Sequence, residues 1–235
     1  MDCHIDLANL MTSLASRIEH TLLKADARRV DIERLCEEAI ERGFHGVCVN
    51  GSWVGLACSI LEGTDLKVVA VAGFPLGAMS ADAKRYETEA AVDEGAHEID
   101  VVLNLGRLKD GESAVVLREL RDIVEAADER PVKVILETAL LTEAEKVLAC
   151  HLAVESGAKF VKTSTGFGPS GATVADVKLL RATVGSKFGV KASGGIRDYK
   201  TARAVIEAGA DRIGTSHGPA ILDGAEAADL SQQQG

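Results

Sequence analysis

Two lysines lie inside short apolar stretches, where a charged side chain is unexpected. Lys162 lies in the middle of the predicted strand 159–164, a polar turn follows at its C-terminal end (163–166), and Lys191 lies within the stretch 189–193. Burial disfavours the charged form of a lysine, and so does a second ammonium nearby. A lysine in its neutral form is a nucleophile toward aldehydes and ketones. If the fold places both lysines in one cavity, the sequence predicts imine chemistry at Lys162.

A repeat indicates the frame that would hold these lysines. Gly43, Gly95, Gly157 and Gly209 each end a helix-like stretch and precede a β-type run, and they are spaced by 52, 62 and 52 residues. A glycine in the left-handed region commonly ends a helix. A strand–helix unit of a barrel takes roughly 30 residues, so each spacing holds about two units. Four such markers therefore imply about eight units.

Eight candidate strands alternate with helical patterns. Apolar strands that alternate with helices indicate a parallel sheet, and eight of them favour a single (β/α)8 TIM barrel, an α/β fold, over residues 1–235. We expect a helical extension at 1–16 and a frayed tail at 223–235. An open doubly wound sheet is the alternative. The predicted strands are 18–22, 46–50, 67–73, 98–104, 132–138, 159–164, 189–193 and 212–215, and the predicted helices are 32–42, 81–94, 113–127, 143–156, 173–184 and 199–208.

The composition narrows the class of protein. The 235 residues carry a formal net charge of -10 without a basic run, which argues against a nucleic-acid partner. None of the five cysteines forms a C-x-x-C pair, which suits reduced thiols rather than disulfides or a zinc site. The first residues, 1–6, do not have the pattern of a signal peptide, and the longest apolar run is far short of a membrane span. We therefore expect a cytoplasmic protein that does not bind a membrane.

Alternation along the strands separates the barrel interior from the surface that faces the helices. In the stretch 98–104, Ile99 and Val101 are apolar and should face the helices, so Asp100 should face inward. Barrel interiors are normally apolar, so a polar cluster from several strands indicates an active site. The alternative is that these lysines form structural ion pairs with Asp100 and Glu137. The predicted inward polar set is Asn50, Asp100, Lys133, Lys162, Ser164, Lys191 and Ser193.

This cluster has the groups of a class I aldolase, which joins a lysine to a carbonyl carbon as an imine. Lys191 beside Lys162 would favour the neutral amine. Asp100 would move a proton, through water, and Lys133 would hold it ionised. The chemistry requires no metal and no cofactor, and the six histidines show no metal-ligand spacing.

Glycine-rich turns follow the last two predicted strands, at 193–198 and 214–218. In α/β barrels the loops after strands 7 and 8 often bind a phosphate through backbone N–H groups. The two turns together predict a phosphorylated substrate.

The motifs as a set resemble the deoxyribose-phosphate aldolase family, from about residue 16 to residue 222. The stretches that carry the resemblance, in the family's order, are IEHTLLK (18–24), VCVN (47–50), GFPLG (73–77), EIDVV (98–102), KVILET (133–138), FVKTSTG (160–166), VKASGG (190–195) and IGTS (213–216).

The resemblance implies reversible cleavage of 2-deoxy-D-ribose 5-phosphate into acetaldehyde and D-glyceraldehyde 3-phosphate. It implies Lys162 as the imine-forming residue, Lys191 as the neighbour that favours its neutral form, Asp100 as the proton donor and acceptor, and Lys133 in the proton relay. It also suggests a homo-oligomer, either a dimer or a tetramer, whose ligands are phosphosugars and aldehydes. The expected substrate and phosphate contacts are Gly194, Gly195, Gly214, Ser216, Thr165 and Asn50.

The sequence differs from the family pattern in the phosphate region. Phe167 stands where some members carry a phosphate-contacting lysine, and His217 replaces a frequent second serine after Ser216. Glu19 stands where the family typically has aspartate. The resemblance therefore supports the chemistry more firmly than the affinity for the phosphate.

Three other functions are compatible with parts of the pattern. A class I aldolase for a 2-keto-3-deoxy sugar acid would keep the imine but needs an arginine for the substrate carboxylate, and no arginine lies at an inward strand position. An isomerase or biosynthetic barrel would use carboxylates without an imine. A non-catalytic barrel would bind phosphosugars without turnover.

Overall fold

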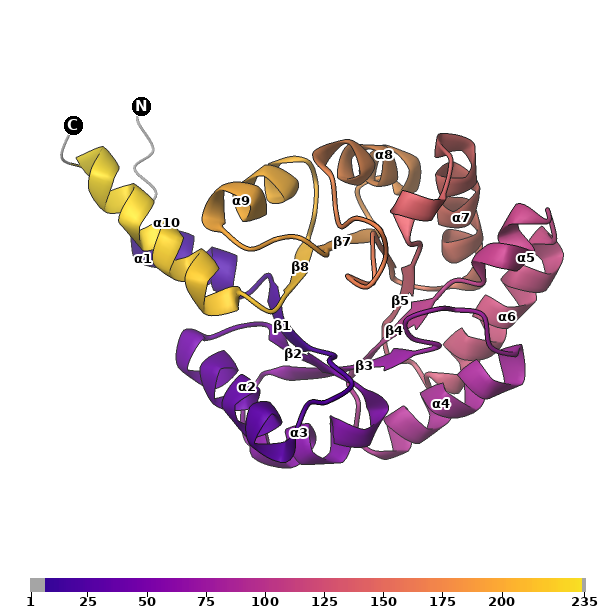
Figure 1. The fold of residues 1–235 in the computed structure, drawn as a ribbon, viewed down its shortest axis with the longest axis horizontal. Coiled ribbons are helices and arrows are strands. Elements are labelled where there is room, and N and C mark those ends of the chain that lie inside the picture. The colour runs from indigo at the N-terminus through magenta and orange to yellow at the C-terminus, as the bar shows by residue number, and fades with distance from the viewer. Residues whose placement is uncertain (1–6, 234–235) are drawn as a thin grey trace.

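The sheet is a closed ring of eight parallel strands in sequence order, surrounded by helices (Figure 1). The computed structural model describes residues 7–233 of the chain. The predicted (β/α)8 barrel is confirmed, and the open sheet is excluded. The strands are β1 (Ile18–Leu22), β2 (Gly46–Val49), β3 (Lys67–Ala72), β4 (Glu98–Val102), β5 (Val132–Ile135), β6 (Phe160–Lys162), β7 (Gly189–Ser193) and β8 (Arg212–Thr215).

The helices lie on the outside of this ring. Several begin with a side-chain cap, such as Thr142, whose hydroxyl accepts a hydrogen bond from the Glu145 N–H. Two short helices, α3 and α5, were not expected from the sequence. The helices are α1 (Leu7–Ala15), α2 (Arg29–Arg42), α3 (Val54–Ile60), α4 (Ala81–Asp93), α5 (Leu105–Lys109), α6 (Ser113–Ala126), α7 (Glu143–Ser156), α8 (Val174–Val184), α9 (Tyr199–Glu207) and α10 (Gly218–Gln233), with 3-10 turns η1 (Gly51–Trp53) and η2 (Thr138–Leu140).

The repeated glycines have the backbone conformation that the sequence predicts. The φ angles of Gly43, Gly95, Gly157 and Gly209 are 63°, 99°, 90° and 113°, all in the region that favours glycine. Each lies between a helix and the strand that follows, namely β2, β4, β6 or β8. The turn from helix to strand is therefore built the same way four times around the barrel.

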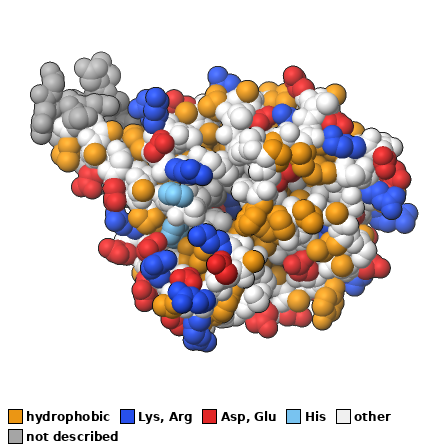
Figure 2. Space-filling model, in the orientation of Figure 1, with side chains coloured by type: hydrophobic (Ala, Val, Ile, Leu, Met, Phe, Trp, Pro, Cys, Tyr) orange, Lys and Arg blue, Asp and Glu red, His pale blue; other side chains and the backbone are white. Residues whose placement is uncertain are grey.

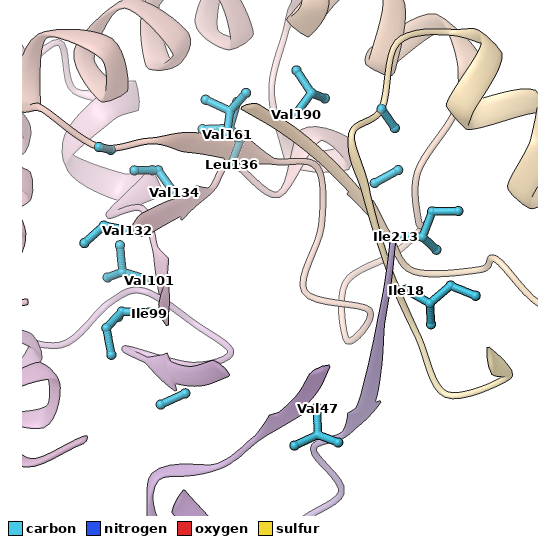
Figure 3. Packing of buried hydrophobic residues seen from close by; sticks show 14 of the residues in the cluster. Ile18, Val47, Ile99, Val101, Val132, Val134, Leu136, Val161, Val190 and Ile213 are labelled. Carbon is cyan, nitrogen blue, oxygen red and sulfur yellow. The ribbon is translucent and has the colours of Figure 1, made fainter. Parts of the chain in front are cut away.

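The main core lies between the strands and the helices. Figure 3 shows alternate strand residues such as Val101, Val134, Val161 and Val190 in this layer. The predicted outward face of the strands is thus confirmed. Inside the barrel, Leu23, Cys48, Val69 and Val71 form a small apolar cluster with Phe74. Val102 and Ile135 are also buried and alternate with the outward-facing residues of β4 and β5. Buried charged residues share this interior with them.

The C-terminal segment corrects one expectation. We expected residues 223–235 to fray, but α10 continues to Gln233 and packs against α1 and α9. The stretch 225–228 contains three alanines and a glutamate, which are strong helix formers. Residues 1–6 of the expected extension and residues 234–235 of the tail lie outside the described residues.

In the described part of the chain, no helix is both long enough and apolar enough to cross a membrane. Cys36, Cys48, Cys58 and Cys150 are all free thiols.

Candidate active site

Three lysine ammonium groups surround one buried carboxylate inside the barrel. The Nζ atoms of Lys162 and Lys191 lie 2.8 and 2.6 Å from Oδ2 of Asp100. Nζ of Lys133 lies 2.9 Å from the other oxygen, Oδ1. The predicted cluster of Asp100, Lys133, Lys162 and Lys191 is therefore one connected group of charges.

Strand register explains why these four residues meet. Asp100 on β4 is aligned with Lys133 on β5, and Lys162 on β6 is aligned with Lys191 on β7. All four face inward because the intervening apolar residues face the helices. Adjacent strands thus provide two pairs, and closure of the barrel brings the pairs together.

Two glutamates complete the cluster. Glu19 on β1 pairs with Lys191 and lies 3.5 Å from Nζ of Lys133. Glu98 on β4 lies 2.5 Å from Nζ of Lys133. Three carboxylates therefore lie among the three lysine side chains in the interior.

Glu137 has a different role from the one considered for it as a partner of the lysines. Its carboxylate accepts hydrogen bonds from the backbone N–H and the hydroxyl of Thr165. The sequence missed Glu19 and Glu98 as lysine partners, although alternation did place Glu98 inside. The sequence feature that could have identified them is a charged residue within a short, mostly apolar strand, β1 for Glu19 and β4 for Glu98.

The charges inside the barrel stabilise one another. Burial by itself would raise the pKa of Asp100, but the three surrounding ammonium groups hold it well below its usual range. Burial would lower the pKa of Lys133 and of Lys191, but the carboxylates of Asp100 and Glu19 outweigh burial and raise both values. Lys191 is therefore a permanent cation beside Lys162 at neutral pH.

Glu98 predicts how the stability of the fold depends on pH. Burial would raise its pKa, but the hydrogen bond from His45 and the charge of Lys133 lower it from 4.5 to about 2. A carboxyl group whose pKa is lowered by folding stabilises the folded state above its unfolded pKa, and this contribution is lost as the pH falls toward the folded pKa. We expect Glu98→Gln to be less stable than wild type at neutral pH, with a difference that shrinks between pH 4.5 and about 2. Urea unfolding across this range measures the difference, and a constant difference would contradict the assignment.

His45, Glu19 and Glu98 also lie close enough together to hold a metal ion, since their ligand atoms are all within 4.8 Å of one another. The ammonium of Lys133 contacts both carboxylates. It supplies the positive charge that a metal ion would supply, so the three residues fit an ion-pair cluster better than a metal site.

A cavity of about 350 Å³ opens above the cluster. Lys162 lines this cavity, whereas Lys133, Lys191 and Asp100 do not and are fully buried. The amine of Lys162 is therefore the interior amine that a small molecule in the cavity reaches. Figure 2 shows Lys, Arg and His side chains between α10 and the centre of this face, with hydrophobic side chains on the other side of the centre.

The residues expected to bind substrate divide into two groups. Gly194, Gly195, Gly214, Ser216 and Thr165 all line the cavity, whereas Asn50 lies outside its lining. Most of the other lining residues were not expected as contacts, because they lie in loops where alternation does not predict side-chain direction, although Thr21 and Leu22 lie on β1. The lining residues that were not expected include Thr21, Lys24 and Arg197, whereas Phe167 and His217, which the family pattern places in the phosphate region, also line the cavity.

The lining has an unusual charge for this chain. It includes Lys24, Lys162, Arg197 and His217, and none of the described residues that line it is acidic. The chain as a whole has 36 acidic and 26 basic residues. A cavity with this lining is suited to an anionic ligand.

Comparisons with known proteins agree with this geometry. Residues 10–224 match the model of the DeoC/LacD family of aldolases. The deoxyribose-phosphate aldolase of Alkaliphilus oremlandii is 55% identical over 212 residues, which cover 90% of this chain and 96% of that protein. The deoxyribose-phosphate aldolase of Streptococcus pneumoniae serotype 19F is 57% identical over 207 residues, or 88% and 94% of the two chains. The tetrameric deoxyribose phosphate aldolase of Aeropyrum pernix superimposes with a TM-score of 0.86 at 34% identity, covering 92% of this chain and 93% of that chain.

Proposed function

This chain belongs to the DeoC/LacD family of aldolases, and on that premise we propose that it cleaves 2-deoxy-D-ribose 5-phosphate reversibly through an imine at Lys162. The products are acetaldehyde and D-glyceraldehyde 3-phosphate. The observation that carries the proposal is the position of Lys162. Its side chain lines the cavity, whereas Asp100, Lys133 and Lys191 next to it are fully buried and do not line it.

Each step of the reaction has a group near Lys162. The neutral amine of Lys162 attacks the C1 aldehyde of the open-chain sugar, and loss of water gives the imine. Removal of the proton from the C3 hydroxyl breaks the C2–C3 bond, which releases glyceraldehyde 3-phosphate and leaves an enamine. Protonation of the enamine at C2 and hydrolysis of the resulting imine release acetaldehyde and regenerate Lys162.

Asp100 and Lys191 support this chemistry from below the cavity. Asp100 lies 2.8 Å from the amine of Lys162, so it can exchange protons with the reacting groups through a water molecule. Lys191 is the cation that disfavours a second positive charge on Lys162. Lys133 keeps Asp100 ionised. Our expectation that Lys162 provides a neutral amine stays a prediction.

The phosphate is assigned to the side of the cavity formed by the loops after β7 and β8. Gly194, Gly195 and Gly214 offer backbone N–H groups there, and Ser216 offers a hydroxyl. Arg197 adds positive charge at the same side, and His217 adds an imidazole ring. This charge supports a phosphate ligand even though Phe167 stands where some relatives carry a lysine.

We also infer a homo-oligomer in the cytoplasm that binds no nucleic acid. The tetrameric relative from Aeropyrum pernix supports an oligomer, and the free cysteines are consistent with a reducing compartment. The net charge of -10 argues against a nucleic-acid partner. These three assignments remain proposals.

Trapping with borohydride tests the imine directly. We expect borohydride, added with deoxyribose 5-phosphate or acetaldehyde, to inactivate the enzyme and to leave a reduced adduct on Lys162, identified by peptide mass spectrometry. An adduct on Lys191 or Lys133 would keep the aldolase and overturn the role of Lys162. Full activity without any adduct would exclude the imine.

Arg197 makes one control necessary, because an arginine in the cavity is a partner for a carboxylate as well as for a phosphate. Pyruvate in place of acetaldehyde should give little adduct. Efficient trapping with pyruvate would favour an aldolase for 2-keto acids instead.

A further inference from the structure

Glu137 has an unusual backbone conformation next to the active site. It follows β5 with φ 50° and ψ 61°, in the left-handed region that favours glycine. Asp128 and Glu129 also have positive φ angles, but they lie in an exposed turn, whereas Glu137 is only 4% exposed. A strained residue persists only where its surroundings hold it, and such residues concentrate at functional sites.

The carboxylate of Glu137 holds the β6–α8 loop (residues 163–173). Its Oε2 accepts hydrogen bonds from the backbone N–H of Thr165, at 3.3 Å, and from the Thr165 hydroxyl. The oxygen of that hydroxyl in turn accepts a hydrogen bond from the N–H of Phe167, at 3.0 Å. A methyl group at Gly168 would lie 2.8 Å from the Glu137 carboxylate, so the loop approaches it as closely as only glycine allows.

The other end of the loop is held by β7. The N–H of Ala172 is 3.0 Å from the carbonyl oxygens of Ser193 and Gly194. A methyl group at Gly171 would lie 2.0 Å from the Gly194 oxygen. Between these two attachments, Thr165, Gly166 and Phe167 form one wall of the cavity. The position of this wall therefore depends on Glu137 at one end and on β7 at the other.

We propose that Glu137 is a positioning residue that fixes this wall for the phosphorylated part of the substrate. The inference rests on the proposed function. Glu137 does not line the cavity, so it acts through Thr165. Lys162 is held separately, by its strand and by Asp100. Loss of the Glu137 carboxylate should therefore weaken the binding of a long phosphorylated substrate and leave the reaction of Lys162 with a two-carbon aldehyde nearly unchanged.

Glu137→Gly tests this role, because glycine accepts the backbone conformation and lacks the carboxylate. We expect its KM for deoxyribose 5-phosphate to rise roughly tenfold or more. The rate at which borohydride traps acetaldehyde on Lys162 should change less than about threefold. Glu137→Gln keeps an oxygen acceptor for Thr165 and should restore most of the affinity. Glu129→Gly removes a left-handed glutamate in the exposed turn and should behave like wild type.

Several outcomes would overturn the proposal. An unchanged KM in Glu137→Gly would show that the wall does not depend on the carboxylate. An equal loss of substrate affinity and acetaldehyde trapping would indicate a general disturbance of the barrel instead. If Glu137→Gly fails to fold, Gly168→Ala is the second test, because its methyl group would lie 2.8 Å from the Glu137 carboxylate, so the carboxylate and the loop could not both keep their positions. A raised KM in Gly168→Ala supports the role, and an unchanged KM overturns it.

Failure of the proposed function would appear separately, as a wild-type enzyme that does not cleave the sugar phosphate.

Discussion

Replacing Lys162 with methionine should abolish cleavage of deoxyribose 5-phosphate, with a loss of at least roughly 10⁴-fold in kcat. Methionine fills the same space and provides no amine, so no imine can form. Lys133 and Lys191 should not substitute for Lys162, because they are fully buried and do not line the cavity. The measurement is the release of glyceraldehyde 3-phosphate in a coupled assay, together with trapping of acetaldehyde by borohydride.

The fold should survive this change. Asp100 keeps its contacts with Lys133 and Lys191 when Lys162 is lost. Lys159→Met is a matched control, because Lys159 precedes the same strand but is exposed. It should retain wild-type activity. Substantial cleavage by Lys162→Met, with an adduct on another lysine, would transfer the imine to that residue.

Replacing Asp100 with asparagine should damage both stability and catalysis. Asp100 contacts the Nζ atoms of three lysines, so a neutral amide removes the carboxylate that they share. Breaking a buried ion pair by removing one partner typically costs about 3–5 kcal/mol. We also expect kcat to fall by about 10²–10⁴-fold, because the group proposed to exchange protons is lost. Urea unfolding and steady-state kinetics measure the two effects.

A double variant separates the two effects of Asp100. Adding Lys133→Met to Asp100→Asn removes the ammonium that contacts Oδ1 along with the carboxylate, while Lys191 keeps Glu19 and Glu98 keeps His45. Part of the lost stability should return, while kcat stays low. If the double variant is less stable than Asp100→Asn, charge balance is not what holds the interior together.

Alternation along the strands was sufficient to predict which residues face inward. On β4 to β7 the apolar residues mark the outer face, so Asp100, Lys133, Lys162 and Lys191 could be placed inside from the sequence. Alternation does not say which inward residues meet across the barrel. The pairing of Lys191 with Glu19 depends on β1 closing against β8, which is a property of the ring and not of either strand.

The loops set a second limit on prediction from sequence. Asn50 follows β2 and faces inward by alternation, yet it lies outside the cavity lining, because the chain turns into η1 immediately after it. Arg197 and His217 also line the cavity. They lie in turns, where the alternation of strand residues does not apply and the direction of a side chain cannot be predicted from the sequence. The left-handed conformation of Glu137 had no signal in the sequence, since glutamate rarely adopts it.

The ring of strands has no free edge, because β1 pairs with both β2 and β8. The first and last described helices, α1 and α10, lie side by side (Figure 1). The charged groups inside depend on which strands are neighbours and not on which strand is made first. A circularly permuted chain, joined where α1 and α10 meet and opened at the exposed residues 128–129, would keep every strand pair. The active site thus belongs to the closed ring and does not depend on which of the eight strands comes first along the chain.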